Sequence, residues 1–243
     1  GNGPGRGTNI YGGGGYGGKG GDDNAAIGGG LVYGLVSAPS DPGSGGANSS
    51  GGHGGGAIWI EALTGTVRVD GVISANGAAG ASGLNGGGSG GSIYIRCGIL
   101  GGSTSGWIRA NGGDSGAQFI YPGAGGGGRV TLLYEALDGT PGLRLTTHIG
   151  RNSWKTVDYS SPQQRVAPEM GTLYFSDPDL MNSLLACWGG TATGVNGYVH
   201  FESTNIWEMS GLILSNAMLG IPESNEWRIA GDLAMTTGQL AVA

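Results

Sequence analysis

Charged residues are scarce in this chain, and those present are scattered. Only 12 % of the 243 residues are Asp, Glu, Lys or Arg, and the formal net charge is −6. The eleven lysines and arginines form no basic run, so the sequence lacks the electrostatic footprint of a nucleic-acid-binding protein. No apolar run reaches the ~20 residues of a membrane-spanning helix. We therefore expect neither nucleic acid binding nor membrane insertion.

Cysteine and catalytic motifs are also rare. The two cysteines, Cys97 and Cys187, are too few for a disulfide framework in a chain of this length. Cys97 is in phase with Ile93 and Ile95, which favours a small buried thiol, although a Cys97–Cys187 bridge stays open. The sequence contains no G-x-S-x-G, no H-E-x-x-H and no Walker phosphate-binding loop, and its three histidines lack metal-ligand spacing. We expect no cofactor, no metal site and no enzymatic activity.

Glycine, in contrast, is abundant. The chain has 58 glycines, of which residues 1–150 hold 49, whereas the average usage is about 7 %. A flexible Gly/Ser linker is the simplest interpretation of such a composition. Between the glycine runs, however, lie the words AIWI, TVRV, SIYI and RVTLLY, whose β-branched and aromatic residues are typical of strands. The glycine-rich region therefore contains enough apolar sequence to bury a core.

Two strand-like words recur at a fixed spacing. The first apolar residues of one word are Ile58, Ile93 and Val130, and the second word repeats with the same steps of 35 and 37 residues. Apolar and polar residues alternate within each word, which indicates strands with one buried face. The residues predicted to face inward as a core stack are Ile58, Ile60, Ile93, Ile95, Val130 and Leu132, and those predicted to form an asparagine ladder at a corner are Asn76, Asn111 and Asn216.

Strands that recur in equivalent positions stack best as a solenoid. The sequence therefore predicts an all-β fold, a parallel β-helix with glycine-rich loops that pack in part like polyglycine II. Residues 1–56 would form a glycine-rich N-terminal segment and first coil, residues 57–150 the regular coils with a repeat of about 35–37 residues, and residues 151–243 a glycine-poor continuation. Residues 178–185 are the one helix-like stretch, equally compatible with a loop.

The order of these words resembles that in a known class of proteins. The stretches YGGGGYGGKGGDD, GGGLVYG, GGGAIWIEALTGTVRVDGVISANG, GGGSGGSIYIRCG and GWIRANGGDSG are similar to the glycine-rich right-handed parallel β-helix regions of large secreted and cell-surface proteins. In that class such regions act as stalks, surface layers or adhesive parts. The glycine runs also resemble the polyglycine-II bundles of phage tail-tip adhesins and some ice-binding proteins. The resemblance implies an extracellular or cell-surface location.

Outward-facing aromatic residues form the candidate interface. Aromatic side chains on a solenoid surface bind sugar rings or contact other proteins; alternatively, they shield the glycine-rich backbone from water. Glu61 and Arg96 are expected to form a weak surface ion pair one coil apart. The aromatic residues predicted for the interface or ligand face are Trp59, Tyr94, Trp107, Tyr121 and Trp154.

These observations favour a non-catalytic structural protein. We expect a β-solenoid segment of a surface filament, appendage or stalk, which associates with itself or with other subunits of a surface structure. The alternative is an adhesin that recognises glycans through its aromatic residues. A polysaccharide lyase or glycoside hydrolase is the least favoured, since it would need acidic and basic side chains clustered in one groove.

Overall fold

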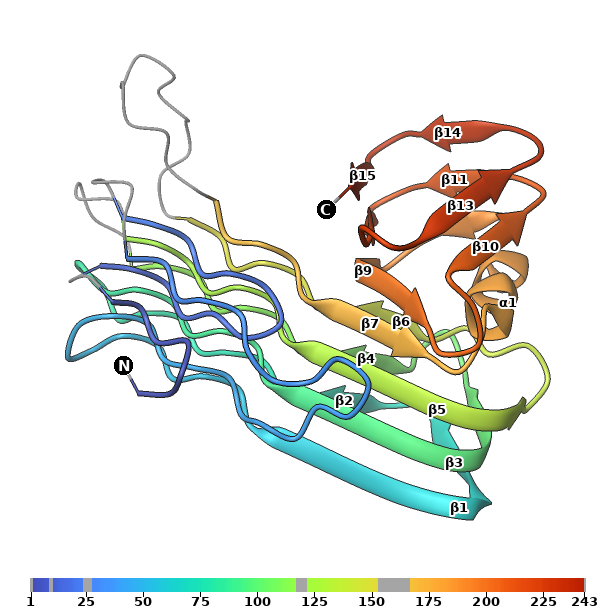
Figure 1. Ribbon diagram of the computed structural model, residues 1–243, viewed down its shortest axis with the longest axis horizontal. Helices are drawn as coiled ribbons and strands as arrows, with labels where there is room; N and C mark the ends of the chain where they lie inside the picture. Colours follow the sequence, from blue (N-terminus) through green and yellow to red (C-terminus); the bar gives the residue numbers. More distant parts are fainter. Residues whose placement is uncertain (1, 9–10, 24–27, 117–121, 153–166, 243) are drawn as a thin grey trace.

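The computed structural model describes residues 2–8, 11–23, 28–116, 122–152 and 167–242, and this part of the chain is nearly all β (Figure 1). Its single helix is α1 (Asp179–Cys187). The strands are β1 (Ala57–Val69), β2 (Val72–Ser74), β3 (Ser92–Gly102), β4 (Trp107–Arg109), β5 (Arg129–Leu137), β6 (Arg144–Thr146), β7 (Thr172–Phe175), β8 (Thr191–Ala192), β9 (Val195–Phe201), β10 (Ile206–Met209), β11 (Leu212–Leu214), β12 (Met218–Ile221), β13 (Glu226–Ile229), β14 (Leu233–Met235) and β15 (Gln239–Val242).

A ten-stranded parallel sheet dominates the fold. Its main path runs β1-β3-β5-β7-β9-β6-β4-β2, and β12 and β15 extend it beyond β9. The long strands form one half and the short strands β2, β4 and β6 the other, so the sheet folds back and nearly closes around the core. Two smaller parallel sheets, β10-β13 and β14-β11-β8, complete the C-terminal part. The expected parallel, nearly all-β architecture is thus confirmed.

The register of the long strands places like residues side by side. Ile58 of β1 lies opposite Ile93 of β3, which in turn lies opposite Val130 of β5. Two residues further along, Ile60, Ile95 and Leu132 form the next row. The residues of β3 and β5 in these rows are fully buried, whereas Ile58 and Ile60 are half-buried because β1 is an edge strand. Period-two alternation therefore places these side chains in one continuous core.

Helix α1 contributes to the same core. It begins after Pro178 and buries Leu180, Met181 and Leu184. The Tyr134 hydroxyl of β5 accepts a hydrogen bond from the Leu180 backbone N–H at 3.1 Å and donates one to Asp177 at 2.7 Å. These contacts fix the start of the helix over the sheet. Of residues 178–185, for which the sequence left helix and loop open, residues 179–185 are helical, and their apolar side chains pack in the core.

The glycine-rich segments run outward from the starts of the long strands and pack side by side (Figure 1). The backbone N–H groups of residues 86–91 point in three directions in turn, so every third residue donates to the same neighbouring segment. Gly87 and Gly90 donate to the carbonyl groups of residues 123 and 126, Gly88 and Gly91 to those of residues 78 and 75, and Gly86 and Ser89 to those of residues 47 and 44. The segment therefore has neighbours on all sides, unlike a strand, whose partners lie in one plane.

The C-terminal third has a shorter repeat. Met218 lies opposite Asn196, and Gln239 lies opposite Met218, so partners are 20 to 22 residues apart along β9, β12, β15 and the strands between them. The structure gives the reason: these repeats consist of strands and turns alone, whereas the repeats of 35 and 37 residues also include an outward and a returning glycine-rich segment.

The asparagine ladder follows the corner after the short strands. The Asn76 side-chain oxygen accepts a hydrogen bond from the Asn111 backbone N–H, and the Asn111 oxygen accepts one from His148, both at 2.8 Å. Asn216 lies outside this row: its backbone N–H donates to Thr237 at 2.9 Å, because the shorter C-terminal repeat brings a different corner into place. Cys97 is buried and Cys187 exposed, and both are free thiols.

Candidate functional site

The outer face of the long strands carries a row of aromatic and polar side chains. Trp59 and Tyr94 stack with ring centroids 3.8 Å apart and planes inclined by 17°. Strand register continues this row across the sheet. Tyr174 and His200 did not stand out in the sequence because the spacing between strands becomes irregular after the repeated word that begins near residue 130. In order from β1 to β9 the row is Trp59, Tyr94, Thr131, Tyr174 and His200.

Residues 31–41 cross this row and cover its middle; we call them the strap. The Thr131 hydroxyl donates a 2.7 Å hydrogen bond to the Val36 carbonyl, and Arg129 donates through Nη2 to the Tyr33 carbonyl at 2.8 Å. Thr131 is consequently fully buried and Tyr94 only 4 % exposed, whereas Trp59 at the sheet edge is 50 % exposed. Tyr94, which the sequence predicts for the interface or ligand face, is thus almost fully buried, with its ring stacked on Trp59.

The other predicted aromatic residues do not join this face. Trp107 lies on β4, in the opposite half of the sheet, where the Arg144 guanidinium carbon is 5.0 Å from its ring centroid and 5.2 Å from that of Trp188. Tyr121 and Trp154 lie outside the described residues. Of the three predicted aromatic residues that the structure describes, it therefore brings together Trp59 and Tyr94.

An open groove of about 650 Å³ lies beside the strap on the outer face of the sheet. The strap residues Ser37 and Ala38 form part of its wall. At one end, a register shift between Ala62 and Thr66 of β1 marks a bulge, whose Leu63 and Thr64 line the groove. At the other end the groove reaches residues that follow β7 and β9. A sequence-only argument could not find this groove, because the strap comes from a different part of the chain.

Three charged side chains line the groove. Arg96 comes from β3, Glu135 from β5, and Glu202 follows β9. All three are exposed, and no hydrogen bond or ion pair joins their side chains to another described residue. Glu61 and Arg96 are opposite each other in the β1–β3 register, but the expected ion pair between them is not formed. The charged groups are thus free to contact a ligand.

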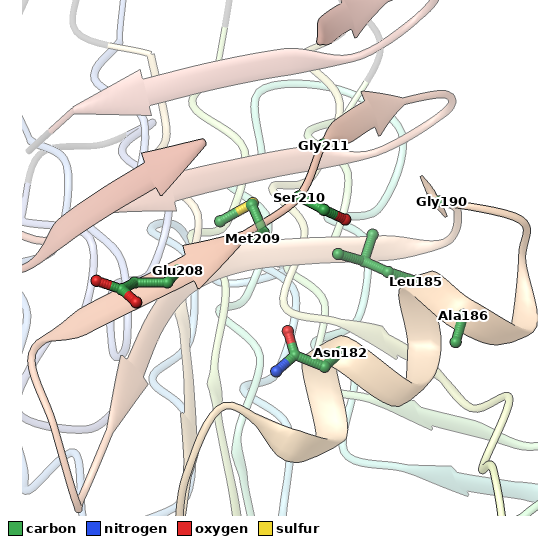
Figure 2. A pocket seen from close by; sticks show the side chains of 8 residues that line it. All are labelled: Asn182, Leu185, Ala186, Gly190, Glu208, Met209, Ser210 and Gly211. Atoms are coloured by element: carbon green, nitrogen blue, oxygen red, sulfur yellow. The ribbon is translucent and has the colours of Figure 1, made fainter. Parts of the chain in front are cut away.

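A second cavity, of about 410 Å³, lies between α1 and β10 (Figure 2). Asn182 and Leu185 project into it from the helix, and Met209 from the strand. The Asn182 oxygen already accepts a hydrogen bond from Trp207 Nε1 at 2.9 Å. Glu208, its only charged lining residue, is ion-paired with Arg228 at 2.9 Å. With its polar groups engaged, this cavity offers less to a ligand than the groove beside the strap.

His200 ends the aromatic row and gives the protein a predicted pH dependence. Burial, followed by the nearby Arg129 guanidinium, lowers the pKa of His200 from 6.5 to about 4. The unfolded chain takes up a proton near pH 6.5, whereas the folded chain does so near pH 4. The stability that neutral His200 contributes is therefore complete above pH 6.5 and is lost as the pH falls from 6.5 to 4.

We expect the free energy of unfolding to fall by about 2 kcal/mol more between pH 7 and pH 4 in the wild type than in His200→Gln, allowing for solvent that reaches the ring. Urea titrations at the two pH values measure this difference. His53→Gln, which replaces an exposed histidine, is the control and should behave like the wild type. Equal pH dependence in wild type and His200→Gln would contradict the assignment.

Comparison with known proteins does not assign a function to the groove or to the second cavity. Among the described residues, α1 is too short to cross a membrane, and no three His, Cys, Asp or Glu side chains come together as potential metal ligands. Searches of protein-family models, curated proteins and solved structures returned no match for this chain.

Proposed function

We propose that this chain is a non-catalytic structural segment of an extracellular or cell-surface filament, appendage or stalk. Its repeats would be coils of a parallel β-solenoid, and its glycine-rich segments would form a bundle of the polyglycine-II type. The observation that carries the proposal is the three-residue period of the hydrogen bonds in residues 86–91, the period of an extended helix with three residues per turn.

This arrangement supports a structural role because the strands and the glycine segments form one mechanical unit. Gly91 precedes β3 directly and donates to the Ala75 carbonyl, while the Gly91 carbonyl accepts from Arg129 at the start of β5. The hydrogen-bond network therefore passes from sheet to bundle without a flexible joint. A wide body held by such a network resists bending in all directions, as a stalk or surface layer requires.

The first repeat offers a surface for self-association. β1 and β2 are the edge strands at the first repeat of the large sheet, and unpaired strand edges are templates for pairing with another chain. Three large apolar side chains at these edges are exposed: Trp59 by 50 %, Leu63 by 54 % and Val72 by 56 %. We propose that copies of the chain, or other subunits of the same structure, associate through this end.

Light scattering coupled to size-exclusion chromatography, over a range of protein concentrations, tests the association. We expect species larger than a monomer for the wild type, and a shift toward monomer in the double variant Trp59→Lys/Val72→Lys, because edge lysines oppose strand pairing. The double variant Leu31→Lys/Leu35→Lys places the same two charges on exposed strap residues and should assemble like the wild type. A wild-type chain that remains monomeric at every concentration would refute the proposal.

A further inference from the structure

The groove beside the strap spans several repeats. It extends from the bulge of β1, across the outward side chains of β3 and β5, to residues after β7 and β9. Four inter-strand steps of about 4.8 Å give it a length of about 19 Å. A groove of this length, open to solvent along one side, fits an extended polymer better than a compact small molecule.

The groove offers both hydrogen-bond donors and acceptors from side chains. Arg96 supplies a guanidinium, Glu135 and Glu202 supply carboxylates, and the hydroxyls of Thr64 and Ser37 serve in either role. Tyr94 lines the groove beside these groups, with its ring stacked on Trp59. Donors and acceptors side by side in one groove match a ligand that is rich in hydroxyl groups, whereas the Tyr94 ring, which is 4 % exposed, adds little surface.

The strands beneath the groove exclude the usual mode of extended peptide binding. A peptide that adds to a sheet needs a free strand edge for its backbone hydrogen bonds. β3, β5 and β7 are each paired on both sides, so their backbone groups are already engaged. Recognition in the groove therefore depends on side chains that project across the strands, and a saccharide satisfies these groups through its hydroxyls.

The geometry points to a binding site for a linear, uncharged oligosaccharide in this groove. Two carboxylates outnumber the single guanidinium, so the site disfavours polymers of acidic sugars, which would place like charges beside Glu135 and Glu202. The groove shares Leu63 with the edge proposed for self-association, but its charged residues Arg96, Glu135 and Glu202 lie outside the β1 and β2 edges.

A glycan array probed with the full chain, followed by calorimetric titration, tests this inference. The titrations use hexamers of uncharged sugars (cellohexaose, xylohexaose and N-acetylchitohexaose), the corresponding dimers, hexagalacturonate and a lysine-rich decapeptide. We expect an uncharged hexamer to bind with a Kd below about 1 mM, and the dimer of the same sugar to bind at least tenfold more weakly because it fills only part of the groove.

Arg96→Ala and Glu135→Gln should each weaken hexamer binding at least tenfold, with unchanged circular dichroism. Glu226→Gln, an exposed carboxylate on β13 outside the groove, should bind like the wild type. A blank array, tighter binding of hexagalacturonate or of the peptide, or an affinity unchanged in both groove variants would overturn the inference. Arg96→Ala and Glu135→Gln change no residue of the β1 or β2 edge, so a loss of hexamer binding with an unchanged assembly state distinguishes the failure of one proposal from the failure of the other.

Discussion

Replacing Gly55 by alanine is expected to lower the free energy of unfolding by about 3 kcal/mol or more, whereas the same change at the adjacent Gly56 leaves stability nearly unchanged. A Cβ atom on Gly55 would overlap the Ala75 carbonyl oxygen and the Gly91 nitrogen. Both are backbone atoms, which move only if neighbouring segments separate, so the cost reaches the upper end of overpacking effects. A Cβ atom on Gly56 has no atom within 4 Å.

Chemical denaturation followed by circular dichroism measures both variants. Gly56→Ala is a closely matched control, because it adds the same methyl group one residue away and restricts the unfolded chain by the same amount, an effect of up to about 1 kcal/mol in the stabilising direction. Gly71→Ala, which also meets no atom within 4 Å, is a second control. If Gly55→Ala unfolds at the same denaturant concentration as Gly56→Ala, the close packing of the glycine segments is wrong.

Replacing Arg129 by methionine is expected to cost about 3 kcal/mol and to release the strap. Arg129 is 5 % exposed, and burial lowers the pKa of its guanidinium. Its Nε and Nη2 donate to the Tyr33 carbonyl at 3.2 and 2.8 Å, and its Nη1 donates to Thr172 at 3.2 Å. Methionine fills most of the volume but leaves these acceptors without a donor, and unpaired buried polar groups account for the expected loss.

Two measurements separate this effect from general destabilisation. Denaturation gives the change in unfolding free energy, and limited proteolysis under native conditions reports cleavage within residues 31–41, which we expect to increase at least tenfold. Arg109→Met removes a partly exposed arginine bonded to Ser74 and should stay within about 0.5 kcal/mol of the wild type. An unaltered strap in Arg129→Met would show that other contacts, such as that of Thr131 with Val36, suffice to hold it.

Several features of the fold could be predicted from sequence because they depend on local pattern. Alternation in AIWIEA and SIYIRC places Ile58, Ile60, Ile93 and Ile95 on one face of their strands. Both repeated words share the steps of 35 and 37 residues. This predicts the register of β1, β3 and β5, since strands in equivalent positions meet in parallel. The stacking of Trp59 on Tyr94 follows from the same register.

The candidate site could be predicted only in part. Tyr94 and Arg96 point to the outer face by alternation, but the groove also needs Ser37 from the strap, Thr64 from the bulge and Glu202 from after β9. The strap reaches its place through contacts such as that of Arg129 with Tyr33, 96 residues apart in the chain. Neither periodicity nor composition carries information about such a contact, because its partners belong to no repeated word.

The amino-acid sequence by itself therefore determined the strands, their inward faces and the repeat, because each is a local pattern that recurs. Only the tertiary structure decided three features: that residues 179–187 are helical, that the strap crosses the outer face of the sheet at Thr131, and that the glycine segments pack as a bundle. Glycine permits many backbone conformations, so a glycine run alone does not specify its neighbours. The neighbours are selected by backbone hydrogen bonds between distant segments, such as those of Gly87 and Gly90 with residues 123 and 126, which form once the strands have placed those segments side by side.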